Sequence, residues 1–160
     1  MKKLFVGLFL CVASLFASNI EIKDAYARAT PPGLPNSAAF MTISNPSSSD
    51  ISLIDVKTTI SNVAELHTHE MKNGMMKMYQ VPKIEIKAHS KTILKPGGFH
   101  VMLLGLKKKP LTTDQKVNLT LIFSNNEKIE VSIPVKSVMG GMKMHKGMKM
   151  DHSNMKMDHK

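Results

Sequence analysis

The sequence is short of cysteine and of aromatic residues, and each shortage excludes a class of function. Cys11 is the only cysteine in 160 residues, tryptophan is absent, and aromatic side chains make up 5% of the chain. One cysteine forms neither an intramolecular disulfide nor a CxxC redox pair. The formal charge is +10, but aromatic residues are few and no nucleic-acid-binding motif is present, which argues against a nucleic-acid-binding protein. We therefore interpret the lysines as solvated surface. No Ser-His-Asp cluster or general-base pattern is present, and we predict that the protein is not an enzyme.

The first 18 residues have the pattern of a secretory signal peptide. A short basic start precedes an apolar run over residues 4–16, which is shorter than the roughly 20 residues that span a bilayer. We expect cleavage near Ala17 or Ser18 and a periplasmic mature protein, with an uncleaved membrane anchor as the alternative. Cys11 could mark a lipoprotein, but the bulky Leu10 before it disfavours that interpretation. Cleavage would leave a mature chain without any thiol.

Residues 20–135 alternate between short β-branched runs and turn residues, a pattern typical of an all-β sandwich or barrel. No segment predicts an amphipathic helix longer than two turns, and Greek-key topology is the expected arrangement. The predicted strands are Ile20–Arg28, Ser37–Asn45, Ile51–Lys57, Ile60–His69, Met75–Val81, Ile84–Ala88, Phe99–Leu104, Val117–Ser124 and Lys128–Val135.

The composition changes after residue 138. Residues 139–160 contain no aromatic and no branched aliphatic side chain, so this tail cannot build a core and is expected to be disordered. We therefore divide the chain into a signal peptide (1–18), a β-domain (19–138) and a Met/His-rich tail (139–160). Low-complexity tracts of this kind usually bind metal. Its Met-x-Met pairs suit Cu(I), and its Asp-His pairs suit Cu(II). Candidate auxiliary ligands in the tail are Met142, Met144, His145, Met148, Met150, His152, Met155, Met157 and His159.

The Asn73-Gly74 pair predicts a two-residue β-hairpin turn. Outward from such a turn, Lys72 pairs with Met75, Met71 with Met76, and His69 with Met78. His67 then lies diagonally from Met78, on the same face as His69, because side chains alternate along a strand. One face of this hairpin therefore offers imidazole and thioether together.

A second His and Met pair follows the turn at residues 96–98. His100 and Met102 are two residues apart, so on a strand they share a face while Val101 points to the other. If both elements meet, they build a site with two nitrogen and two sulfur ligands. Soft, neutral thioethers favour Cu(I), and unlike thiolates they form no disulfides in an oxidising compartment. Without cysteine the mature chain cannot assemble a blue-copper centre, which leaves transport or buffering of copper.

The order His67, Met78, His100, Met102 matches the H-x10-M-x21-H-x-M signature of the periplasmic PCu(A)C copper chaperones. Residues 25–28, 37–45, 65–67 and 95–106 also resemble that family, and the resemblance covers residues 20–135. It implies a cupredoxin-like β-barrel and a Cu(I) ion held by these four side chains. It further implies delivery of copper toward the dinuclear site of cytochrome oxidase, often together with a Sco-type protein.

Several interpretations remain side by side at this point. The hairpin register favours His69 as the neighbour of Met78, whereas the family spacing selects His67, so His69 is kept as a candidate auxiliary ligand. Met71, Met75 and Met76 lie near the same hairpin tip and could serve likewise. Met41 is interpreted as core and His89 as solvated surface. The alternative function is a periplasmic protein that sequesters copper for tolerance without a dedicated acceptor. A nickel- or zinc-binding module is a third option, which the methionine content disfavours.

Overall fold

The protein is described here by a computed structural model, which covers residues 20–107 and 110–137 and contains only strands and loops over these ranges. In this part of the chain no helix is long and apolar enough to cross a membrane. The ten strands are β1 (Glu21–Arg28), β2 (Ser37–Asn45), β3 (Ile51–Thr58), β4 (Ser61–Lys72), β5 (Met75–Gln80), β6 (Ile84–Ile86), β7 (Ser90–Leu94), β8 (His100–Leu106), β9 (Lys116–Phe123) and β10 (Lys128–Lys136).

Apolar and polar side chains alternate along several strands, and β9 shows this pattern most clearly. In β9, Val117, Leu119, Leu121 and Phe123 are buried, and the residues between them are not. Successive side chains on a strand point to opposite faces, so this pattern turns one face to the core and the other to solvent.

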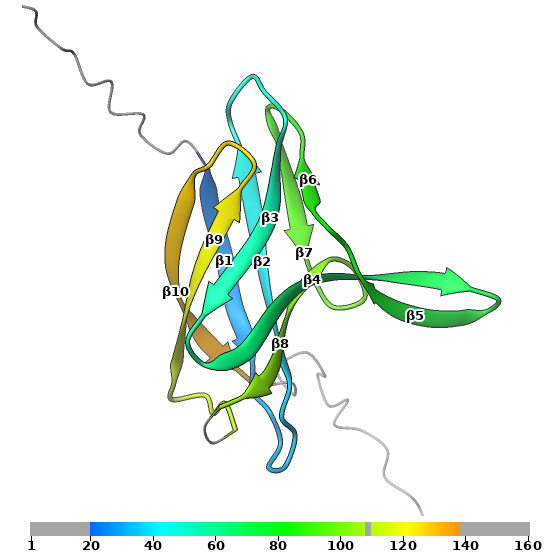
Figure 1. Cartoon of the computed structure of the whole chain (residues 1–160), viewed down its shortest axis with the longest axis vertical. Coiled ribbons are helices and arrows are strands. Elements are labelled where there is room, and N and C mark those ends of the chain that lie inside the picture. Colours follow the sequence, from blue (N-terminus) through cyan, green and yellow to red (C-terminus); the bar gives the residue numbers. More distant parts are fainter. Residues whose placement is uncertain (1–19, 108–109, 138–160) are drawn as a thin grey trace, which may run out of the picture.

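The strands are arranged as two layers packed face to face (Figure 1). Strands β1, β2, β4, β5, β7 and β8 make one layer, and β3, β6, β9 and β10 make the other. A parallel pairing of β1 with β10 joins the layers, and β5 and β6 end the strand order. The chain crosses between layers at β2–β3, β3–β4, β5–β6, β6–β7 and β8–β9. This is an open sandwich, and the prediction of an all-β Greek-key sandwich is confirmed.

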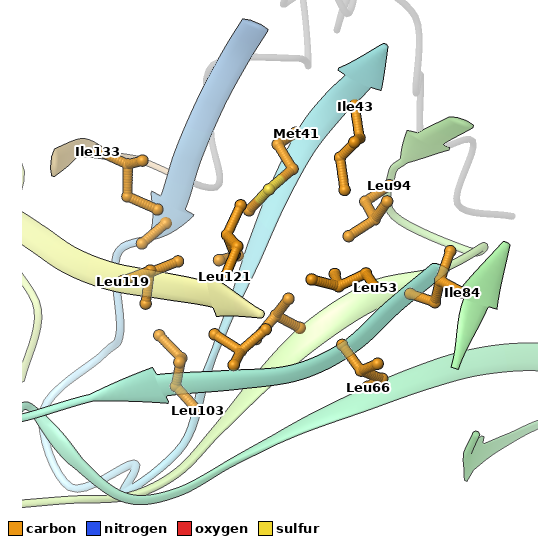
Figure 2. Close-up of a cluster of buried hydrophobic side chains, with 14 of the residues drawn as sticks. Met41, Ile43, Leu53, Leu66, Ile84, Leu94, Leu103, Leu119, Leu121 and Ile133 are labelled. Atoms are coloured by element: carbon orange, nitrogen blue, oxygen red, sulfur yellow. The ribbon is translucent and has the colours of Figure 1, made fainter. Parts of the chain in front are cut away.

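The core lies between the layers and is built from aliphatic side chains of both (Figure 2). Met41 is 2% exposed within it, as predicted, and each fully buried side chain of this size stabilises the fold by about 1.5–3 kcal/mol. Leu66 of β4 and Val101 of β8 also belong to the core. Their neighbours in sequence therefore point to the outer face of the layer, which is where the candidate site lies.

The nine predicted strands are all present, with ends that differ by up to three residues. Strand β7, which pairs with β2, was not predicted from the sequence. In this five-residue strand Leu94 is buried while its neighbour Ile93 is 49% exposed, and the rest is polar. Only one of its side chains enters the core, so its hydrophobic pattern was too weak to predict a strand.

Candidate metal centre

The hairpin of β4 and β5 has the register that the Asn73-Gly74 turn predicts. Asn73 and Gly74 have φ of 53° and 74°, as a two-residue turn of this kind requires. His69 is paired with Met78 and Met71 with Met76, so these four residues share one face. The hairpin projects beyond the sandwich (Figure 1), and Met78 is 47% exposed.

The base of β4 is paired with β8, which brings the two predicted half-sites together. His67 lies opposite His100, and Glu65 lies opposite Met102. Leu66 and Val101, the pair between them, face the core. The side chains of the two flanking pairs therefore all point to the outer face of the layer: His67, His100, Glu65 and Met102.

The imidazole of His100 is held in one tautomer and faces a thioether. The side chain is 2% exposed, and its Nδ1 lies 2.8 Å from the carbonyl oxygen of Gly98. A carbonyl only accepts hydrogen bonds, so Nδ1 carries the proton and donates it. The other nitrogen, Nε2, then has a free electron pair, and it lies 3.2 Å from Sδ of Met78.

Burial lowers the pKa of His100 below its ordinary value. The hydrogen bond to Gly98 opposes this shift, while the nearby His69, His67 and Arg28 add to it. A lowered pKa keeps the ring neutral, so Nε2 and the sulfur face each other as two electron-pair donors. Such a pair is suited to sharing a soft cation.

His67 presents its opposite ring nitrogen. Its Nε2 lies 2.7 Å from Oε2 of Glu65, and in a neutral ring this nitrogen donates the proton to the carboxylate. Its Nδ1 is buried and has no hydrogen-bond partner among the described residues. Buried nitrogens are normally paired, so an unpartnered one beside a second imidazole fits a metal ligand. Histidine ligands commonly donate their other N–H to a carboxylate in this way.

His69 lies close to the same place. Its ring stacks on His100 with centroids 5.0 Å apart, and the His67 ring lies 5.9 Å from His100. Its Nδ1 is 3.5 Å from the carbonyl oxygen of Gly98, which is long for a hydrogen bond. Both histidines therefore flank His100. In residues 20–107 and 110–137 no group of three or more His, Asp or Glu side chains is placed to hold a metal.

Met102 continues the same face beyond His100. It is half-buried, pairs with Ala38 and Glu65, and lines a groove of about 350 Å³ together with Arg28 and Leu34. Two residues along a strand are separated by roughly 7 Å. Of the four predicted ligands, Met78 and His100 are thus in contact, His67 lies beside them, and Met102 follows next on the face.

The residues that orient the histidines were not predicted from the sequence. Glu65 precedes His67 by two residues, so strand alternation alone could have placed its carboxylate beside that ring. The carbonyl of Gly98 and the ring of Phe40, 6.2 Å from His100, depend on turn and sheet geometry that the sequence does not show. The candidate ligands at 142–159, like the signal peptide at 1–18, lie outside the described residues.

Comparison with known proteins shows the family of this chain. A family model described as "Putative lipoprotein LpqE-like" matches residues 20–135. The chain belongs to the LpqE-like family. A relative named as a putative lipoprotein in Leifsonia xyli subsp. xyli is 33% identical over 132 residues, which cover 82% of this chain and 78% of that protein.

Two solved structures are similar to this LpqE-like protein, and both hold copper. The Cu(I) form of DR1885 from Deinococcus radiodurans is 34% identical, covers 78% of this chain and 83% of its own, and superposes with a TM-score of 0.62. The copper-bound PCuAC domain from PmoF2 covers 75% of this chain and 94% of its own, with a TM-score of 0.64. At 21% identity the second likeness shows the fold alone. The resemblance to PCu(A)C domains is therefore confirmed in the fold, and the four-residue signature stays a prediction.

Proposed function

We propose that the protein is an exported copper chaperone that carries one Cu(I) ion and gives it to a partner by ligand exchange. The observation that carries this proposal is the 3.2 Å approach of His100 Nε2 to Met78 Sδ. The only N–H of the neutral ring, at Nδ1, donates its hydrogen bond to the carbonyl oxygen of Gly98, so Nε2 and the sulfur meet as two electron-pair donors. A soft cation between them would convert this approach into a binding site.

We propose His67, Met78, His100 and Met102 as the four ligands. The unpartnered Nδ1 of His67 supplies a second imidazole, and Met102 supplies a second thioether on the same face. Two thioethers and two neutral imidazoles favour Cu(I) over Zn(II) or Ni(II). The relationship to DR1885, whose structure is known as a Cu(I) form, supports the choice of metal.

The two halves of the proposed site differ in exposure, and this difference supports release by exchange. Met78 is 47% exposed on the projecting hairpin, whereas His100 is 2% exposed and packed against the sandwich. An acceptor's thiolate or imidazole would displace Met78 first and His100 last. Ligand exchange transfers no electron, so the ion stays Cu(I) throughout.

The compartment and the acceptor follow from the resemblance rather than from this geometry. We propose the periplasm as the location, and the dinuclear copper site of cytochrome oxidase or a Sco-type protein as the acceptor. The lipoprotein names of the family and of the Leifsonia protein make acylation at Cys11 the alternative to cleavage near Ala17 or Ser18. An apo oxidase copper domain that takes no copper from the loaded protein would favour sequestration over delivery.

A Cu(I) competition titration against a chromophoric chelator tests the site. The wild type should bind one tight equivalent, and the Met78→Leu/Met102→Leu variant should bind it at least about tenfold more weakly, a loss of roughly 1.4 kcal/mol. Met75→Leu is the matched control, because Met75 is an exposed hairpin methionine on the opposite face. Equal affinity in the double variant and the wild type would refute these ligands.

A further inference from the structure

The end of the β4–β5 hairpin exposes methionine and no other apolar side chain. Met71, Met75, Met76 and Met78 are 64%, 61%, 59% and 47% exposed. They are the only apolar residues between positions 71 and 78. Thioethers are soft ligands that suit Cu(I), so four exposed methionines on one hairpin end are suited to binding this ion.

Two of these methionines face each other across the hairpin. Met71 is paired with Met76, one position beyond the residues that flank the Asn73-Gly74 turn. In a two-residue hairpin the flanking pair exchanges hydrogen bonds, so the next pair is of the closer kind, with Cα atoms roughly 4.5 Å apart. Two flexible thioether side chains on such a pair can reach one ion between them.

This methionine pair is continuous with the proposed Cu(I) site. Alternation puts Met71 and Met76 on the face that carries His69 and Met78, which is the next pair toward the sandwich on that face. Pairs on one face are spaced by roughly 7 Å along the strands. Met78 in turn contacts His100. Soft ligands therefore extend from the hairpin end to the buried imidazole.

The charged side chains of the hairpin end lie on its other face. Lys72 pairs with Met75, and Lys77 pairs with Glu70, so alternation directs all four away from the Met71–Met76 face. A cation approaching that face meets neutral sulfur without a lysine beside it. This separation also makes Met75 a control that is equally exposed but outside the path.

We propose that Met71 and Met76 form a second, weaker Cu(I)-binding site, where the ion is captured before it passes to Met78 and His100. The inference rests on the proposed function, since it assigns an entry point to the same copper site. Binding is weaker here because two water-exposed thioethers act without an imidazole. Transfer replaces two neutral thioethers by a neutral thioether and a neutral imidazole and moves no electron, so the ion stays Cu(I).

Methyl-labelled methionine NMR of the mature protein, titrated with Ag(I) as a redox-inert soft ion, tests the inference. Single Met→Leu variants assign each methyl signal, which separates the hairpin from the methionines at 139–157. The first equivalent should shift Met78 and Met102, and excess Ag(I) should then shift Met71 and Met76 together. The signal of Met75 should stay in place.

The Met71→Leu/Met76→Leu variant should bind one equivalent of Ag(I) less than the wild type, because the later binding step at the hairpin end is lost. Its affinity for the first equivalent of Ag(I) should be unchanged. Met75→Leu should behave as the wild type. Unmoved Met71 and Met76 signals, with Met78 and Met102 shifted, would overturn the second site alone. A Met75 shift as large as theirs would overturn it as well, because any exposed thioether would then suffice. Unmoved Met78 and Met102 signals would instead refute the proposed function.

Discussion

At the scale of single residues, hydrogen-bond partners decide which ring nitrogens are available to a metal. The carbonyl of Gly98 accepts a hydrogen bond from His100 Nδ1–H and leaves Nε2 free, whereas the carboxylate of Glu65 accepts one from His67 Nε2–H and leaves Nδ1 free. Partners of this kind orient metal-binding histidines and raise their basicity. We therefore expect Glu65 to influence copper affinity without being a ligand.

Glu65→Gln should weaken Cu(I) binding by roughly tenfold, the lower end of the effects seen when such partners are removed. An amide can donate as well as accept, so it no longer forces the proton of His67 onto Nε2. Glu70→Gln is the matched control, because Glu70 is exposed on the other face of the same strand. Competition titrations of both variants check this, and wild-type affinity in Glu65→Gln would contradict it.

The pH dependence of the metal-free protein should report the burial of His100. Its pKa is lowered on folding, chiefly by burial, so below about 6.5 the unfolded chain takes up a proton that the folded protein resists. The free energy of unfolding should therefore fall as pH decreases from 7.5 to 5. Urea denaturation with a chelator present measures this slope.

His100→Gln is the comparison for that slope. The variant lacks the titrating group, so its stability should depend less steeply on pH over the same range, whatever its absolute stability. Identical slopes in the two proteins would show that His100 titrates normally in the folded state.

Part of the candidate site could be predicted from the sequence, and part could not. Asn73-Gly74 determines the pairing of His69 with Met78, because turn type sets hairpin register. The pairing of His67 with His100 joins segments 33 residues apart, and only the folded sheet shows it. Register and resemblance favoured different histidines beside Met78, and the structure places both His67 and His69 next to His100.

At the scale of elements, β4 connects the sandwich to the hairpin. From Ser61 to His67 it pairs with β8, and from His67 to Lys72 it pairs with β5. Leu66 anchors the strand in the core just before it leaves the layer. The position of Met78 over His100 thus depends on the turn that closes the hairpin.

Gly74→Ala should loosen that turn and weaken Cu(I) binding. No atom lies near an added Cβ, but φ is +74°, where an L side chain costs roughly 1–2 kcal/mol. A loss of 1 kcal/mol corresponds to about fivefold in an equilibrium, which sets the scale of the expected loss in affinity.

Gly98→Ala is the control for this strain. An added Cβ there would lie 3.6 Å from the Lys95 side chain, an ordinary contact, at a φ outside the left-handed range. Titration and thermal melts of both variants check the prediction. Equal affinity in Gly74→Ala and Gly98→Ala would show that the turn does not control the site.

At the scale of the whole molecule, the sandwich buries His100, one half of the proposed site, and leaves Met78, in the other half, exposed to solvent. Strand β8 lies between β4 and β2 and carries His100 on its outer face and Leu103 in the core. The all-β class was predictable from alternation and turn residues, as β9 illustrates. The order of strands was not, because it depends on pairings between segments far apart in sequence.

Deleting residues 139–160 should lower the total copper bound and leave one tight Cu(I) equivalent. The tail adds Met and His ligands by composition, while the proposed four-ligand site lies within the β-domain. A tail of equal length with Met and His replaced by Ser controls for chain length. Copper analysis and competition titration measure stoichiometry and affinity. Loss of the tight site on deletion would mean that the tail supplies its ligands.

X-ray absorption spectroscopy of the mature protein loaded with one equivalent of Cu(I) tests the central claim most directly, because it counts nitrogen and sulfur neighbours of the ion. We predict a mixed shell of imidazole nitrogen and thioether sulfur, whose sulfur contribution falls in Met78→Leu/Met102→Leu and is unchanged in Met75→Leu. A shell of sulfur alone, or a mixed shell unaffected by the double substitution, would contradict a copper site built from His67, Met78, His100 and Met102.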